Sequence, residues 1–149
     1  DKHSRSGPRP RDAHLRLDMT RAAQETLFRE VGPAHAGPHL TTAQVYQAGI
    51  GDVVLARRDF GTSYHLAVVL DDTAQGVTHV TRGEDLFDAT AIHVLLQALL
   101  DLPTPTYCHH RLIRGPDGRR LAKRDDARAI RLYRAEGATP QDIRRMVGL

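Results

Sequence analysis

Gln-Gly-Val-Thr-His-Val-Thr-Arg-Gly-Glu-Asp, residues 75–85, is the stretch that decides the fold of this chain. Its β-branched residues predict a short buried strand over residues 77–81, which stops abruptly at Arg82. In an open α/β sheet, ligands bind at the carboxyl ends of the strands and in the loops that leave them. Arg82 therefore stands where its planar guanidinium can bind a carboxylate or a phosphate. The alternative is that Arg82 forms a structural ion pair with Glu84 or Asp85.

The segments before this strand predict a β-hairpin. Residues 53–55 are expected to form its first strand, and residues 59–63 its connection. The β-branched run over residues 64–70 is expected to form its second strand, which begins at Tyr64. Two acids at positions 71 and 72 would close the hairpin, and solvation of a strand end explains them better than a catalytic carboxylate pair.

Helices are predicted on both sides of these strands. Asp18 can cap a first helix, and the residues that would share its apolar face are Ala23, Leu27 and Val31. The Gly-Pro pairs at 32–33 and 37–38 are then expected to interrupt regular structure. Asp88 or Thr90 can cap another helix. Its apolar stripe would consist of Ile92, Leu95, Leu96 and Leu99.

The last third of the chain predicts an extended segment followed by two short helices. Residues 106–113 read as extended, and residues 115–118 fit a type I turn. Ile130 and Tyr133 lie on one face of the first helix. Thr139 can cap the second, which has proline at its first position. Strands that alternate with helices in this way indicate an α/β domain.

Composition indicates a soluble globular protein. The chain has 149 residues, of which 40% are hydrophobic and 26% are charged, and its apolar runs are too short to span a bilayer. A single cysteine, Cys108, excludes an internal disulfide framework and is compatible with a reducing cytoplasm.

Charge is distributed unevenly along the chain. Residues 1–110 carry 10 basic and 13 acidic side chains, whereas residues 111–149 carry 11 basic and 5 acidic ones. The basic end indicates a polyanionic partner, either a nucleic acid or a nucleotide phosphate. A solvated, arginine-rich helix face explains the same composition equally well.

Three side chains are candidates for binding chemistry. Tyr64 and Arg82 could converge on one pocket if their strands are neighbours, and a hydroxyl beside a guanidinium would suit an amino-acid-like ligand. The alternative is that both are structural. Lys123 lies in a basic segment after a glycine-containing turn, where it could stabilise the charge of a transferring phosphate. Without other information, a solvent-exposed loop lysine is the simpler interpretation.

The sequence does not predict a metal site. Cys108, His109 and His110 are adjacent, but neighbouring residues of a strand point to opposite faces and make poor joint ligands. Neither a Cys-x-x-Cys nor a His-Glu-x-x-His pattern occurs.

Three motifs together resemble the second half of the catalytic domain of class I glutamyl-tRNA synthetases. They are Tyr-His-Leu-Ala-Val-Val-Leu-Asp-Asp at 64–72, Gly-Val-Thr-His-Val-Thr-Arg-Gly-Glu-Asp at 76–85, and Leu-Ala-Lys-Arg at 121–124. Their order and spacing agree with the family over about residues 50–130. The chain is most similar to the truncated branch, the glutamyl-Q tRNA(Asp) synthetases, which activate glutamate with ATP and transfer it to the queuosine of tRNA(Asp).

Two features favour the truncated branch. Only 26 residues follow Lys123, too few for the anticodon-binding domain of full-length glutamyl-tRNA synthetases. Val68 stands four residues after Tyr64, where the full-length enzymes commonly have asparagine. A fragment of an ordinary glutamyl-tRNA synthetase, discriminating or non-discriminating, is the alternative within this family. A non-catalytic, basic RNA-binding module is the alternative from another class.

The resemblance implies a fold and a set of site residues. The fold would be the second half of a Rossmann-like α/β catalytic domain, ending in short helices. Tyr64 and Arg82 would bind glutamate, and Lys123 would help to hold ATP, with Mg²⁺, and stabilise the adenylation transition state. His109 matches a histidine of the family. The signature loop would comprise Arg120, Leu121, Ala122, Lys123 and Arg124.

The chain also departs from the family pattern. Arg120, Ala122 and Arg124 replace Lys, Ser and Ser of the loop's best-known form. The His-Ile-Gly-His motif, the first glutamate-binding residues and the cysteine-rich zinc segment are absent, so that zinc is expected only in a missing N-terminal part. We therefore expect residues 1–15 to be a linker or fragment edge and residues 16–149 to be the C-terminal part of the catalytic domain, inactive alone, monomeric and cytoplasmic.

Overall fold

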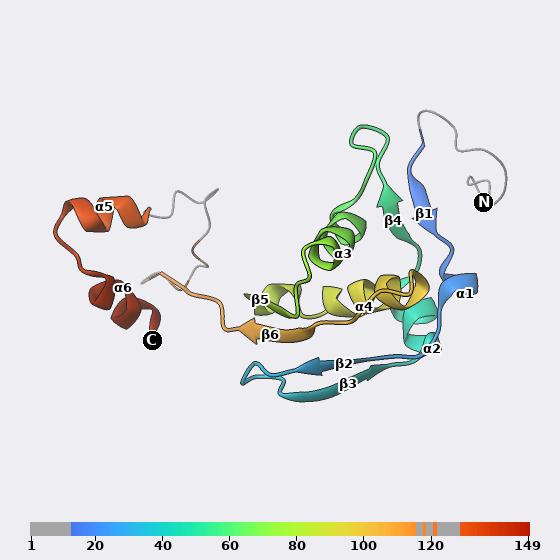
Figure 1. Ribbon diagram of the computed structural model, residues 1–149, viewed down its shortest axis with the longest axis horizontal. Helices are drawn as coiled ribbons and strands as arrows, with labels where there is room; N and C mark the ends of the chain where they lie inside the picture. Colours follow the sequence, from blue (N-terminus) through green and yellow to red (C-terminus); the bar gives the residue numbers. More distant parts are fainter. Residues whose placement is uncertain (1–12, 116–117, 119–120, 122–128) are drawn as a thin grey trace. The chain divides into compact units, whose positions relative to one another are not determined.

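The computed structural model describes residues 13–115, 118, 121 and 129–149 (Figure 1). The chain divides into two compact units, Asp1–His110 and Arg111–Leu149, each with its own internal contacts. The first unit contains the sheets and the central helices, and the second contains two short helices.

A four-stranded mixed sheet organises the first unit. Its strands are β2 (Thr26–Glu30), β3 (Gly37–Thr41), β5 (His79–Gly83) and β6 (Thr106–His110), in the order β3-β2-β6-β5. β6 runs parallel to both β2 and β5, whereas β3 is antiparallel to β2. The carboxyl ends of three strands therefore meet at one edge of the sheet.

One helix, α4 (Ala89–Leu99), covers a face of this sheet. It follows β5 and the short 3-10 helix η2 (Glu84–Leu86), and it packs against both the helix α3 (Tyr64–Ala74) and β2 (Figure 1). Phe28, Val94 and Tyr107 form a buried cluster between α4 and the strands. The unit β5–α4–β6 is thus a parallel crossover, in agreement with the predicted α/β class.

A second core cluster joins Leu95 of α4 to a small two-stranded sheet. This sheet pairs β1 (Leu15–Leu17) with β4 (Val53–Ala56). The short helices α1 (Met19–Ala22), α2 (Ala43–Val45) and η1 (Tyr46–Ile50) pack beside it. The cluster consists of Met19, Tyr46, Val53 and Leu95, all buried.

The predicted hairpin over residues 53–70 is wrong in its second half. β4 is a strand as expected, but Tyr64–Ala74 forms the helix α3. Ser63 begins this helix as its N-cap, because its hydroxyl accepts a hydrogen bond from the backbone N–H of Leu66. The β-branched run suggested a strand, but packing against α4 outweighs that weak preference. The acids at positions 71 and 72 lie inside the helix.

The first predicted helix is also wrong beyond its first turn. Asp18 does cap a helix, but α1 ends at Ala22. Residues 26–30 then form β2, in which Thr26, Phe28 and Glu30 are buried while the residues between them are exposed. This period of two is the signature of a strand. The two Gly-Pro pairs also differ, because 32–33 lies in a turn while 37–38 begins β3.

The remaining elements lie close to their predicted segments. α4 and β6 form where expected, and α4 buries Leu95 and Leu96, although Leu99 is exposed. β5 is His79–Gly83, two residues later than predicted, and none of its residues is fully buried, so the expectation of a buried strand that stops at Arg82 is wrong. The second unit contains α5 (Ile130–Ala135) and α6 (Pro140–Val147). Thr139 and Asp142 form the expected capping box of α6. No helix in the described part of the chain is long and apolar enough to cross a membrane.

Candidate functional site

The parallel strands bring three polar side chains to one edge of the sheet. Glu30 ends β2, Arg82 lies one residue before the end of β5, and His109 lies one residue before the end of β6. Arg82 is the register partner of His109 in the parallel pair. The edge that the sequence singled out as a ligand site is therefore built from residues far apart in the chain.

Arg82 is held by uncharged acceptors. Its Nε donates to Nε2 of His109 at 3.0 Å, one terminal nitrogen donates to Nδ1 of His93 at 2.9 Å, and the other donates to the hydroxyl of Thr90 at 2.6 Å. Its guanidinium also lies 5.2 Å from the ring centre of Tyr107. Within the described residues its bonds go to these groups and not to Glu84 or Asp85, so the alternative of a structural ion pair with either acid is wrong.

These contacts leave part of the guanidinium available. Arginine carries five N–H donors, and the three bonds use one on each nitrogen. One N–H remains on each terminal nitrogen without a partner among the described residues. A planar guanidinium with an N–H to spare on both terminal nitrogens can bind a carboxylate. Arg82 is partly exposed.

His93 is kept neutral by its surroundings. It is buried on α4, and burial together with the charge of Arg82 lowers its pKa to about 3. Its Nδ1 accepts from Arg82, so the ring proton is on Nε2, which donates to Nδ1 of His65 at 3.0 Å. Burial and Arg82 lower the pKa of His65 as well. Neither imidazole therefore competes with Arg82 for an anion at neutral pH.

The carboxylate of Glu30 contacts His109 on the side of the imidazole away from Arg82. Its Oε2 lies 2.5 Å from Nδ1 of His109, and its Oε1 accepts from the backbone N–H groups of Gly32 and His109. Burial alone would raise the pKa of Glu30, but these three donors together lower it below its ordinary value. Glu30 is therefore ionised at neutral pH although its side chain is inaccessible to solvent.

Tyr64 reaches the site from a helix and not from a strand. It is the first residue of α3, its side chain is about half exposed, and its ring lies 5.7 Å from that of His93. Since His93 also accepts from Arg82, the structure brings Tyr64 and Arg82 to the same imidazole. The predicted convergence from two neighbouring strands is wrong, because Tyr64 belongs to a helix.

The signature-loop candidates lie mostly outside the described residues. These are Arg120, Ala122, Lys123 and Arg124. Leu121 is described, is exposed, and donates its backbone N–H to the carbonyl of Ile113. The role of Lys123 stays a prediction.

The described residues contain no group of three or more His, Cys, Asp or Glu side chains that could hold a metal ion. Cys108 is a free cysteine in β6, between the buried Tyr107 and His109. Its neighbours His109 and His110 differ in exposure, as alternating strand residues do.

Sequence reasoning missed four members of the site: Glu30, His65, Thr90 and His93. Glu30 was hidden because β2 was read as a helix. His93 and Thr90 lie on the buried side of α4 among leucines, three residues apart. Two polar residues on the same face of an apolar helix were the available signal, because buried polar groups need partners.

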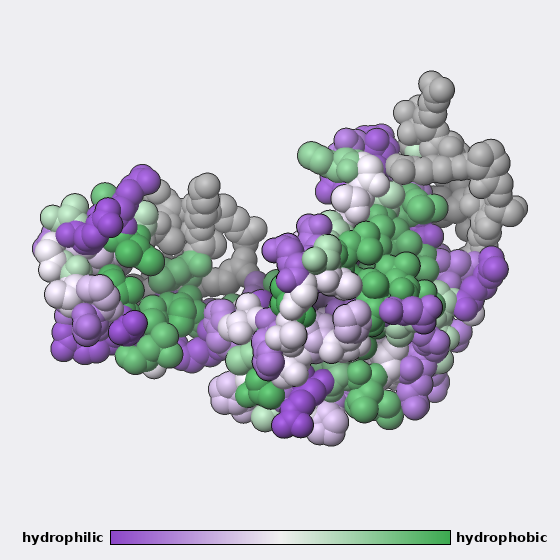
Figure 2. Space-filling view, in the orientation of Figure 1, coloured by the Kyte–Doolittle hydropathy of each residue, from purple (hydrophilic) through white to green (hydrophobic). Residues whose placement is uncertain are grey.

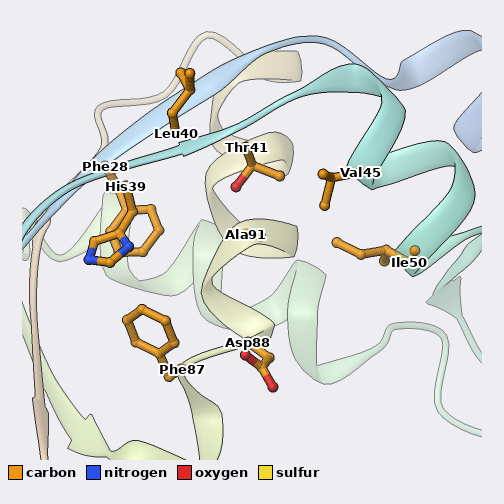
Figure 3. Close-up of a pocket in the computed structure, with 10 residues that line it drawn as sticks. Phe28, His39, Leu40, Thr41, Val45, Ile50, Phe87, Asp88 and Ala91 are labelled. Atoms are coloured by element: carbon orange, nitrogen blue, oxygen red, sulfur yellow. The ribbon is translucent and has the colours of Figure 1, made fainter. Parts of the chain in front are cut away.

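A separate cavity of about 430 Å³ lies between the β2–β3 pair, η1 and the start of α4 (Figure 3). Its walls are mainly apolar, with the rings of Phe28, His39 and Phe87 grouped at one end and Ile50 at the other. Asp88 is the charged side chain among its lining residues. Arg82 and Tyr64 do not line this cavity, so it is distinct from the strand-end site.

Comparisons with known proteins agree on one family. The family described as tRNA synthetases class I (E and Q), catalytic domain, matches residues 38–149. A glutamyl-Q tRNA(Asp) synthetase of Rhodobacter capsulatus is 64% identical over 146 residues, which are 95% of this chain and 52% of that protein. A glutamate–tRNA ligase of Synechococcus is 46% identical over 98 residues, 62% of this chain and 21% of that protein.

A solved structure supports the same relationship. The glutamate-tRNA synthetase of Elizabethkingia anophelis superposes with a TM-score of 0.54 and 30% identity, over 69% of this chain and 20% of that one. This chain spans about half the length of the Rhodobacter capsulatus relative. The predicted fold class is confirmed by these matches, and the chain belongs to the family of class I tRNA synthetase (E and Q) catalytic domains.

Proposed function

We propose that this chain contributes the strand-end part of a glutamate site in an enzyme that activates glutamate with ATP. The glutamyl group would then be transferred to the queuosine of tRNA(Asp). The observation that carries the proposal is the arrangement of Arg82, which is held by uncharged acceptors and keeps an N–H on each terminal nitrogen that could bind a carboxylate. The name of the Rhodobacter capsulatus relative supports the choice of reaction.

Tyr64 supplies a second contact in this proposal. Its hydroxyl would hydrogen-bond the bound amino acid while its ring packs beside His93. His93 and His65 are neutral at neutral pH, so Arg82 supplies the positive charge of this cluster. The chain's part in catalysis is thus to hold glutamate by its side-chain carboxylate, so that the α-carboxylate is positioned to attack the α-phosphate of ATP.

ATP and its Mg²⁺ would be held in part by Lys123, with Arg120, Leu121, Ala122 and Arg124 as the surrounding loop. This assignment rests on the match to the family's loop motif in the sequence. A lysine ammonium there would stabilise the charge that develops during adenylation. We expect the enzyme to act as a monomer in the cytoplasm, where ATP and tRNA are available.

The second unit is suited to contact tRNA. It carries 11 of the chain's 21 basic side chains, and its boundary at residue 111 coincides with the change in charge along the sequence. Hydrophilic residues cover much of its visible face (Figure 2). Basic side chains on short helices favour phosphate contacts, which position a nucleic acid without reading its sequence. If the chain were instead a non-catalytic RNA-binding module, this unit would make the RNA contacts.

A chimera tests the proposal. This chain would replace the matching 146-residue segment of the Rhodobacter capsulatus relative. Glutamate-dependent ATP–pyrophosphate exchange is the readout, and the unmodified relative is the positive control. We expect exchange with glutamate and none with glutamine, which lacks the side-chain charge. A folded chimera without exchange would refute the enzymatic function, and charging of tRNA(Glu) in place of tRNA(Asp) would favour the ordinary glutamate–tRNA ligase.

A further inference from the structure

We propose that Glu30 is a positioning residue of the glutamate site, which acts on Arg82 through His109 by fixing the tautomer of the imidazole. The expected effect on the KM for glutamate rests on the proposed function. The tautomer of His109 follows from the contacts of Glu30, His109 and Arg82 alone.

The first step concerns the proton of His109. Its Nε2 lies 3.0 Å from Nε of Arg82, which can only donate. Nε2 must therefore accept, and a neutral imidazole then carries its proton on Nδ1. That proton points at Oε2 of Glu30, 2.5 Å away. The carboxylate thus selects the tautomer that presents an acceptor to Arg82, in the way that an outer carboxylate fixes a metal-ligating histidine.

The second step concerns the orientation of Glu30 itself. Its other oxygen, Oε1, accepts from the backbone N–H of Gly32 at 2.6 Å and from that of His109 at 2.9 Å. Both donors belong to the main chain and cannot turn away. Gly32 is essential to this closeness, because a Cβ at that position would lie 2.6 Å from Oε1 and 2.4 Å from the carbonyl oxygen of His109. One oxygen is locked by the backbone, and the other is left for the imidazole.

The third step is what an amide would do in place of the carboxylate. In Glu30→Gln the oxygen must stay at the two backbone N–H groups, so the NH2 group faces Nδ1 of His109. The imidazole then accepts at Nδ1 and moves its proton to Nε2. Two N–H donors, one from His109 and one from Arg82, would face each other across 3.0 Å. Arg82 would lose an anchor and turn away from its position.

Two readouts test this inference. In ¹⁵N NMR of the full chain, we expect His109 to be protonated on Nδ1 in the wild type and on Nε2 in Glu30→Gln. In the chimera, we expect Glu30→Gln to raise the KM for glutamate about tenfold with a smaller change in kcat. Glu25→Gln is the matched control, because Glu25 is exposed just before the same strand and should change neither readout. An unchanged tautomer in Glu30→Gln would overturn the proposal.

A second pair of variants serves if Glu30→Gln does not fold. His109→Gln can place an amide oxygen near the position of Nε2, where it accepts from Arg82. His109→Asn can only reach the position of Nδ1 and leaves Arg82 without that acceptor. We expect the KM for glutamate to rise much less in His109→Gln than in His109→Asn. Equal KM values would show that the imidazole matters only for packing. Absence of exchange in the wild-type chimera would instead refute the proposed function and leave the NMR result to decide the inference.

Discussion

Arg82 shows how a single residue can be held firmly and still remain able to bind. Its three bonds go to two imidazoles and a hydroxyl, none of which neutralises its charge. The carboxylate of Glu30 does not contact Arg82 directly, because the imidazole of His109 lies between them. An arginine paired directly with a carboxylate would have to break that pair before binding a substrate carboxylate. The neutral partners orient the guanidinium and leave its charge for the ligand.

The sequence could identify Arg82 and Tyr64 but not the groups that hold them. A strand that ends in arginine is visible locally, whereas the partners Glu30, His93 and His109 are separated from it by up to 52 residues. Their polar atoms meet only when three parallel strands and α4 are assembled. Buried hydrogen-bond partners are a tertiary property, and a single sequence gives little sign of them.

The neutral state of His93 makes stability depend on pH. Its folded pKa, about 3, lies below the value near 6.5 of an unfolded histidine. The unfolded chain therefore binds the extra proton between these values, so stability is complete above pH 6.5 and falls as the pH is lowered. We expect the wild type to lose about 2 kcal/mol more than His93→Gln between pH 6.5 and pH 4.5.

Urea unfolding at a series of pH values measures this difference. The exposed His79 provides the control, since His79→Gln should leave the pH dependence of the wild type unchanged. A wild type and a His93→Gln variant with the same dependence would mean that His93 is not buried as a neutral group. The window stays above pH 4.5 so that the lowered pKa of Glu30 adds little.

At the scale of elements, α3 and β2 show where local patterns mislead. The run that begins at Tyr64 is rich in β-branched residues, but it is a helix with a serine cap that packs on α4. β2 lies in a segment with Ala23, Leu27 and Val31 at helical spacing, but it is a strand whose alternate residues are buried. α6 was predicted correctly because its own cap residues define it. Where a segment lacks clear turn or cap residues, its packing against neighbouring elements decides whether it forms a helix or a strand.

The turn after β2 is an element on which the site depends. Gly32 packs so closely against β6 that a Cβ would lie 2.4 Å from the carbonyl oxygen and 2.8 Å from the nitrogen of His109. We expect Gly32→Ala to lower the free energy of unfolding by about 2–4 kcal/mol, because the backbone must shift and the bonds of Glu30 lengthen.

Chemical denaturation compares this variant with Gly49→Ala. A Cβ on Gly49 would meet its nearest atom at 4.0 Å, so that change should cost less than about 1 kcal/mol. Equal stability of the two variants would contradict the close approach between this turn and β6. We also expect Gly32→Ala to raise the KM for glutamate, because Glu30 could no longer orient His109.

At the scale of the whole molecule, the chain combines a strand-end site with a separate basic unit. The site lies within the first unit, and its residues come from β2, α3, β5, α4 and β6. The sequence could predict the α/β class and the charge asymmetry. It could not predict the order β3-β2-β6-β5, because strand neighbours that are distant in sequence leave no local pattern.

The central claim is that the fork of Arg82 binds the carboxylate of glutamate. The measurement that tests it most directly is the KM for glutamate in ATP–pyrophosphate exchange by the chimera carrying Arg82→Gln. Arg29→Gln, a change of an exposed arginine on β2, is its matched control. We predict a rise of roughly 100-fold in KM for Arg82→Gln and no change for the control. A KM for Arg82→Gln equal to that of the unmodified chimera would contradict the account.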